Sequence, residues 1–188
     1  MRRPTAFLAG LMLAILAVPA LAHDHEEAKA AASSGDVRGE ILFFVDDAEK
    51  KLTALAEAMP AEKFAWRPAE KVRSVGEVFM HVAGGNYFLP TFWDAKPPEG
   101  LNPQEFEASG GDKAKVIATM KASFEHVRKA IQNAPEADLG KAIKMFGHDA
   151  TVRAAMLAVA SHAHEHLGQS IAYARMNAVT PPWSVGGQ

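Results

Sequence analysis

The chain has 188 residues, of which 20 are Lys or Arg and 22 are Asp or Glu, and it contains no cysteine. The absence of cysteine excludes disulfide bonds and thiolate ligands, so every metal ligand must be a nitrogen or an oxygen atom. A formal net charge of −2 at pH 7 does not provide the basic surface that binds nucleic acid, and we expect no nucleic-acid partner.

The first 22 residues have the three parts of a secretory signal peptide. Arg2 and Arg3 form a positive segment, residues 7–18 are apolar, and residues 20–22 form a small-residue cleavage site. The apolar segment is too short to span a bilayer, and no cysteine follows it for lipid attachment. We therefore expect export to the periplasm without a stable membrane anchor. Cleavage removes 22 of the 188 residues and leaves 166, beginning with a flexible leader over residues 23–35 that lacks an apolar stripe.

Two amphipathic helices are predicted in the first half of the exported chain. Asp36 caps the first, over residues 37–59, where apolar side chains recur at helical spacing. The second is predicted over residues 75–95, because Ser74-Val75-Gly76-Glu77 has the Ser-x-x-Glu form of a capping box. The turn residues Pro97-Pro98-Glu99-Gly100 then end this helix.

Two further helices are predicted in the second half. The third extends from near Asp112 to Pro135, and residues 141–146 alternate in polarity as a short extended stretch would. The fourth is capped by Asp149 or Thr151 and continues to about Asn177. Four amphipathic helices without a convincing sheet predict an all-α fold, a four-helix bundle whose core is a common location for metal sites.

Two histidines on the last predicted helix have the spacing of a metal-binding pair. His162 and His166 lie one helical turn apart, with roughly 5–6 Å between their Cβ atoms, and both fall within the apolar stripe. His164 lies about 160° from either on the helical wheel and is expected to point toward solvent. The pair is either a hydrogen-bonded core feature or two ligands of one ion, and a third ligand would decide. His81, on an apolar face of the second predicted helix, is the candidate.

The residues around these histidines each have two interpretations. Gly84 and Gly85, one turn beyond His81, either leave a volume for substrate or water beside a metal or allow close helix packing. Gln169 either orients a ligand or substrate by hydrogen bonding or is an ordinary, partly buried amide. Four aromatic residues either line an apolar pocket or belong to the core, namely Tyr87, Phe88, Phe92 and Trp93.

Several segments occur in a distinctive order: Trp66-Arg67-Pro68, Arg73-Ser74-Val75-Gly76-Glu77 leading to His81, His162-x-x-x-His166-x-Gly168-Gln169, and Tyr173-x-Arg175 to Pro181-Pro182. In this order the chain resembles the DinB-like (DinB/YfiT) superfamily of metal-binding four-helix bundle proteins. The resemblance implies an antiparallel bundle over residues 36–183, in which His81, His162 and His166 hold a divalent metal ion, and it also implies a possible homodimer. The chain departs from many members in having Glu165 where they have histidine, so neither Glu165 nor His164 inherits a role.

A site of three neutral imidazoles leaves at least one coordination position open, which is typical of catalytic rather than structural metal sites. Imidazole suits zinc, nickel, iron and copper, so the sequence does not select the metal. The leading hypothesis is metal-dependent hydrolysis of an unknown small-molecule substrate. No general base is predicted, because Glu77 and Glu165 lie off the inward faces of their helices. The alternatives are a non-catalytic metal-binding or stress-related module and, from the resemblance, a metal-dependent thiol transferase, against which export argues.

Overall fold

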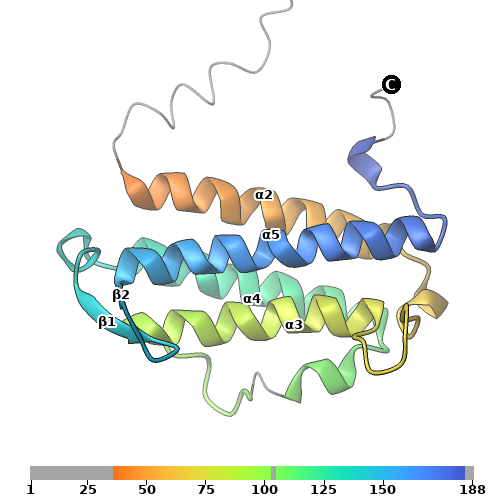
Figure 1. Cartoon of the computed structure of the whole chain (residues 1–188), viewed down its shortest axis with the longest axis horizontal. Coiled ribbons are helices and arrows are strands. Elements are labelled where there is room, and N and C mark those ends of the chain that lie inside the picture. The colour runs from red at the N-terminus through yellow and green to blue at the C-terminus, as the bar shows by residue number, and fades with distance from the viewer. Residues whose placement is uncertain (1–35, 103–104, 185–188) are drawn as a thin grey trace, which may run out of the picture. The chain divides into compact units, whose positions relative to one another are not determined.

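The computed structural model describes residues 36–102 and 105–184 (Figure 1). Its longer elements, in chain order, are α2 (Val37–Ala58), α3 (Val75–Phe88), α4 (Lys113–Asn133), β1 (Ala142–Met145), β2 (His148–Thr151) and α5 (Val152–Met176). The predicted signal peptide, residues 1–22, and the leader, residues 23–35, lie outside the described residues. Within the described part of the chain, no helix is long and apolar enough to cross a membrane.

The helices form a bundle in which each packs against two others. α2 contacts α4 and α5, and α3 contacts the same two helices. α2 and α5 run in one direction along the bundle, and α3 and α4 run in the other (Figure 1). Two hydrogen bonds agree with the parallel pair, because Asn86 and Trp93 bond to Ser123 and Ala130 in the same order along the chain. The loop from α3 to α4 therefore returns along the length of the bundle. The four long helices of the described chain confirm the predicted all-α fold.

Side chains at the helix N-termini explain where the helices begin. The carboxylate of Asp36 accepts a hydrogen bond from the first turn of α2, and Asp112 does the same for α4. Ser74 and Glu77 form the complete capping box that the sequence predicted for α3. Of the two predicted caps of the last helix, Thr151 is the one observed. Each cap satisfies a backbone N–H group that would otherwise lack a partner.

The second helix is shorter than the predicted range of 75–95. α3 ends at Phe88 and the chain continues as the 3₁₀-helix η2 (Leu89–Trp93). Pro90 explains the change, because proline lacks the backbone N–H that would continue the α-helical hydrogen bonds. Asp94, with a positive φ of 66°, then ends η2.

The predicted extended stretch is one half of a small β-hairpin. β1 pairs with β2 in antiparallel register, from Ala142 opposite Thr151 to Met145 opposite His148. The turn between them consists of Phe146 and Gly147, both with positive φ, at 52° and 85°. β1 also contacts η2, so the hairpin lies beside the C-terminal end of α3. The sequence pattern predicts β1 but not β2, where Asp149 is instead one of the two candidate helix caps.

The core lies between the four long helices of the described chain, and Phe64 from the connector after α2 also belongs to it. Its largest fully buried side chains include Leu52 from α2, Phe79 from α3, Phe124 from α4, Met156 from α5 and Phe64 from the connector. Burying a side chain of this size contributes roughly 1.5–3 kcal/mol to folding. This packing holds α3 and α5 side by side, and those two helices carry the histidines of the candidate site.

Candidate metal centre

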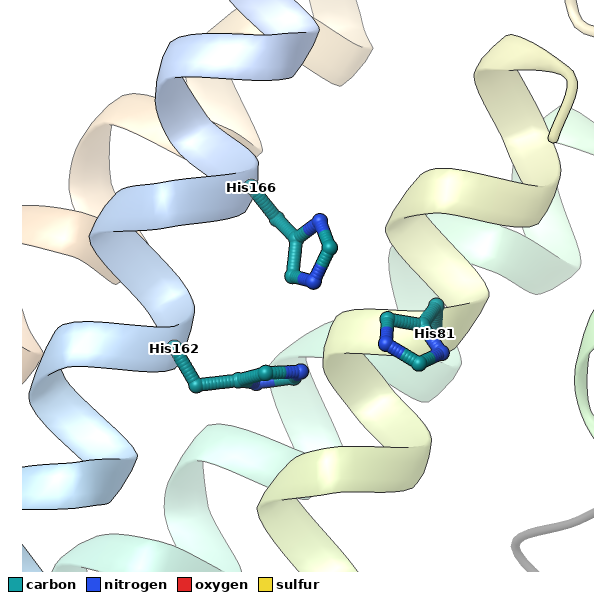
Figure 2. A group of neighbouring side chains, drawn as sticks. All are labelled: His81, His162 and His166. Carbon is teal, nitrogen blue, oxygen red and sulfur yellow. The ribbon is translucent and has the colours of Figure 1, made fainter. Parts of the chain in front are cut away.

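Three histidines from two helices converge in the structure. His81 projects from α3 toward His162 and His166 of α5 (Figure 2). Their ring centroids are 4.6 to 5.1 Å apart. One ring nitrogen of each lies within 4.8 Å of the others, so this group, here called the His triad, could hold a metal ion. The fold thus brings together all three histidines that the sequence selects as candidate ligands.

Glu107 orients His81, and it is not among the site residues that the sequence predicts. Its Oε1 accepts a 2.6 Å hydrogen bond from Nδ1 of His81, and its Oε2 accepts one of 2.9 Å from Nε of Arg73. Burial alone would raise the pKa of Glu107, but the hydrogen bonds from Arg73 and His81 outweigh it and lower that pKa. The carboxylate is therefore ionised and accepts a hydrogen bond from the protonated Nδ1 of His81, which leaves Nε2 of that ring as the nitrogen for a metal.

A close backbone crossing holds Glu107 in this position. Glu107 begins the 3₁₀-helix η4 (Glu107–Ser109) in the loop between α3 and α4, and η4 packs on α3. A Cβ atom on Gly76 would overlap the carbonyl oxygen of Gly110, so only glycine permits this approach. The loop residues from 107 to 110 are thereby fixed against the first turns of α3, next to His81.

Gln169 orients His166 in a similar manner. Nδ1 of His166 donates a 2.8 Å hydrogen bond to Oε1 of Gln169, and the amide Nε2 of Gln169 donates to the hydroxyl of Tyr173 at 3.1 Å. Of the two interpretations of Gln169, the structure supports the one in which it orients a histidine. Nε2 of His166 is therefore again the ring nitrogen that faces a metal.

His162 is the most constrained member of the triad. Its Nδ1 is buried and has no hydrogen-bond partner among the described residues. Burial, together with the nearby His166, His81 and Arg73, lowers the pKa of His162 from its ordinary value of 6.5 to about 4. Burial is also the largest cause of the lowered pKa of His81. His162 and His81 are therefore neutral at pH 7, the protonation state in which imidazole binds metals.

Gly85 makes room for the ring of His162. A Cβ atom at position 85 would collide with Cε1 of His162 and lie 2.7 Å from Nδ1. The glycine therefore permits close packing between α3 and a histidine ring of α5, and the volume beside it is filled by that ring. Of the two interpretations of Gly85, a space for substrate or water and close helix packing, the structure supports close packing.

An open pocket lies beside the triad, and we call it the triad pocket. It has a volume of about 510 Å³ and includes His81, His162 and Glu107 in its wall. The other lining residues are Gly84, Gly85, Phe88, Leu89 and Phe146. Of the four aromatic residues considered from the sequence, only Phe88 lines this pocket. Tyr87 is buried in the core, and Phe92 and Trp93 line a separate cavity.

The remaining described histidines lie apart from the triad. His164 packs against α2, where its ring meets that of Phe44 at 6.1 Å and its Nε2 lies 3.5 Å from the carboxylate of Asp47. It points away from the triad as predicted, but toward α2 rather than open solvent. His126, on α4, packs its ring against that of Tyr87 on α3, with 5.0 Å between the ring centroids. His148 is exposed on the hairpin.

Comparison with known proteins agrees with this architecture. The family model of the DinB superfamily matches residues 45–170. A DinB-like protein from Bacillus cereus ATCC 10987 superimposes with a TM-score of 0.64 at 14% identity, over 74% of this chain and 93% of the other. A DinB-like protein from Bacillus subtilis gives a TM-score of 0.59 at 21% identity, over 75% and 93%. No curated protein matches the chain. The family match spans α3, α4 and most of α2 and α5, including every member of the His triad, and the chain therefore belongs to the DinB superfamily.

Proposed function

We propose that this protein is an exported, metal-dependent hydrolase in which His81, His162 and His166 hold one divalent ion. The observation that carries the proposal is the convergence of three ring nitrogens within 4.8 Å at the wall of an open pocket. Nitrogen ligands of this kind suit zinc, nickel, iron or copper. A site with three protein ligands leaves room for water or substrate, which distinguishes catalytic metal sites from closed structural ones.

The surroundings of the triad fit a divalent ion. Hydrogen bonds to Glu107 and Gln169 occupy Nδ1 of His81 and His166, so the Nε2 atoms are the free ligands. A buried ring nitrogen without a partner, such as Nδ1 of His162, ordinarily destabilises a fold by about 1–3 kcal/mol. Metal binding would offset that cost by stabilising the folded site.

The proposed chemistry divides between the ion and the chain. A bound divalent ion would polarise a carbonyl or phosphoryl oxygen and lower the pKa of water. The chain would orient the ligands, through Glu107 on His81 and Gln169 on His166, and would hold the reacting group within the triad pocket. Glu107 is the one acidic side chain among the residues that line this pocket. Because both of its oxygens already accept hydrogen bonds from His81 and Arg73, we assign Glu107 the role of orienting His81.

Export is a separate part of the proposal and rests on the three-part signal in residues 1–22. Intact-mass measurement of periplasmic material tests it. We expect a mature chain that begins at His23. A chain that still begins at Met1 would contradict export without bearing on the metal site.

Hydrolysis is tested with the mature chain loaded with each candidate metal, against panels of carboxylic and phosphoric esters and of amides. We expect metal-dependent turnover that a chelator abolishes and added metal restores. His162→Ala should remove this activity, whereas His164→Ala, the matched control on the same helix, should retain it. Metal binding without turnover of any ester or amide would instead support a non-catalytic module, and transfer of a small thiol would support the transferase alternative.

A further inference from the structure

Phe146 occupies an unfavourable position at the tip of the β-hairpin. Its φ of 52° lies in the left-handed region, which bulky side chains rarely adopt. Two-residue hairpin turns with positive φ at both positions favour Asn, Asp or Gly at this point. The side chain is also 62% exposed, so burial provides little compensation. Turn geometry and burial alone therefore do not account for a phenylalanine at this position.

The ring of Phe146 belongs to a group of three rings from separate elements, here called the phenylalanine cluster. Its centroid lies 5.1 Å from that of Phe92 on η2 and 6.2 Å from that of Phe88 at the end of α3. Phe88 and Phe92 lie 5.5 Å apart in an edge-to-face arrangement. Aromatic rings at these separations attract one another beyond the effect of burial alone. The hairpin is thus placed so that its tip residue extends an aromatic surface.

That surface and the His triad share one pocket. Phe88, Leu89 and Phe146 form an apolar part of the triad pocket, while His81, His162 and Glu107 form its polar part. Phe92 does not line the pocket and contacts the two lining rings. A volume of about 510 Å³ falls within the usual range of small-molecule sites, which combine apolar walls with a few polar groups.

We propose that Phe146 is a specificity residue that contacts an aryl group of the substrate while an oxygen of that substrate lies at the His triad. This inference rests on the proposed metal site and names the substrate class as small aryl acids or their acyl derivatives. The polar part of the pocket receives the oxygen, and the phenylalanine cluster receives the flat apolar group. Exposure of Phe146 is expected for a ring whose partner is a ligand.

The inference is tested with two chelating probes that differ only in the apolar group, benzohydroxamate and acetohydroxamate. Calorimetry of the Zn²⁺-loaded mature chain gives the ratio of their affinities. We expect the wild-type protein to prefer benzohydroxamate, and Phe146→Ala to reduce that preference about 3- to 10-fold, the range of a single aromatic contact. Affinity for acetohydroxamate should change less than about 2-fold, because its methyl group does not reach the cluster. Phe43→Ala is the matched control, since Phe43 is a similarly exposed phenylalanine, at 59%, on α2.

A second variant separates specificity from folding. Phe146→Asn places a residue that tolerates positive φ at the turn, so we expect Tm to stay the same or rise while the preference for the aryl probe falls. Phe146→Tyr, which keeps an aromatic ring, should retain the wild-type preference for the aryl probe. A clear fall in Tm of Phe146→Asn with an unchanged probe preference would show that the ring serves the fold, and would overturn the inference.

The outcomes also distinguish this inference from the proposed function. If acetohydroxamate binds only in the presence of metal, but the phenyl group adds no affinity that Phe146→Ala removes, then the inference fails and the open metal site stands. If neither hydroxamate binds the metal-loaded protein, both the open site and the inference are overturned.

Discussion

At the scale of single residues, the site depends on groups that hold the histidine rings. Glu107 accepts a hydrogen bond from Nδ1 of His81, and Gln169 accepts one from Nδ1 of His166. Each contact fixes which ring nitrogen faces the centre of the triad, so a free rotation of the ring is removed before any metal binds. His162 has no such partner, and its orientation is set by packing against Gly85.

Replacement of Glu107 should weaken metal binding without removing a ligand. We expect Glu107→Ala to lower the affinity for a divalent ion about 10- to 100-fold, as is usual when a group that orients a metal ligand is lost. Competition with a chelator of known affinity measures this change. Glu99→Ala, at an exposed position in the same loop, is the control and should leave the affinity unchanged. Equal affinities for Glu107→Ala and the wild-type protein would show that the contact does not orient His81.

Sequence could reveal the ligands but not the residue that orients His81. His162 and His166 follow from helical periodicity, and Gln169 lies on the same helix, so its contact is local. Glu107 is 26 residues from His81, in a loop with no periodic pattern. Only the fold brings it to the site, through the close approach of Gly76 to Gly110, which no local rule anticipates.

At the scale of elements, the contact between α3 and α5 requires a glycine. The ring of His162 occupies the space where a side chain on Gly85 would lie. Metal binding and helix packing are therefore coupled at this position. Any side chain there must move either the ring or the helix, because protein interiors are closely packed.

Substitution of Gly85 should abolish metal binding, whereas substitution of Gly168 should preserve it. We expect Gly85→Ala to displace His162 and to abolish stoichiometric metal binding, and we expect Gly85→Leu to do the same. Gly168→Ala, where a Cβ would meet no atom within 4 Å, should keep metal binding and stabilise α5 by about 0.5–1 kcal/mol. Metal titration and denaturant unfolding measure the two effects. Full metal binding by Gly85→Ala would mean that the ring of His162 adjusts without cost.

The elements themselves were largely predictable, and the exceptions have local causes. Capping residues such as Ser74 and Asp36 mark helix starts by hydrogen bonds within a few residues, so their effect is visible in sequence. The end of α3 differed because Pro90 changes α-helix into 3₁₀-helix rather than ending the turn structure altogether. β2 was missed because its four residues directly precede α5, and Thr151 serves as both the last strand residue and the helix cap.

At the scale of the whole molecule, the fold keeps three histidine side chains neutral at pH 7. His81, His126 and His162 all have lowered pKa values, and in each case burial is the largest cause. Neutral imidazoles inside the bundle suit metal binding, but they make the metal-free protein sensitive to acid. Protonation of these rings is easier in the unfolded chain, where water surrounds them.

The metal-free protein should lose stability in weak acid. In the unfolded chain His162 takes up a proton near pH 6.5, whereas in the folded protein it does so only near pH 4. Because the unfolded state binds more protons between these values, the free energy of unfolding falls as the pH decreases from 6.5 to about 4, and this group has no effect at higher pH. We expect a loss on the order of 3 kcal/mol from His162, at about 1.4 kcal/mol for each pKa unit.

Denaturant unfolding of chelator-treated protein at a series of pH values measures this loss. His162→Asn removes one titrating ring and should make the dependence less steep over the same interval, leaving the contributions of His81 and His126. The lowered pKa of Glu107 adds a further loss in more acidic solution, since that carboxylate is stabilised in its ionised form by the folded state. Stability that does not change between pH 6.5 and 4 would contradict the burial of His162 in its neutral form.

Measurement of bound metal in a set of histidine variants shows whether His81, His162 and His166 together hold one divalent ion. Elemental analysis of the purified, metal-saturated mature chain should give one ion per chain for the wild-type protein and for His164→Ala. It should give none for His81→Ala, His162→Ala or His166→Ala, because two remaining imidazoles do not retain the ion through purification. One ion per chain in any of these three variants, or its loss in His164→Ala, would contradict the assignment of the metal centre.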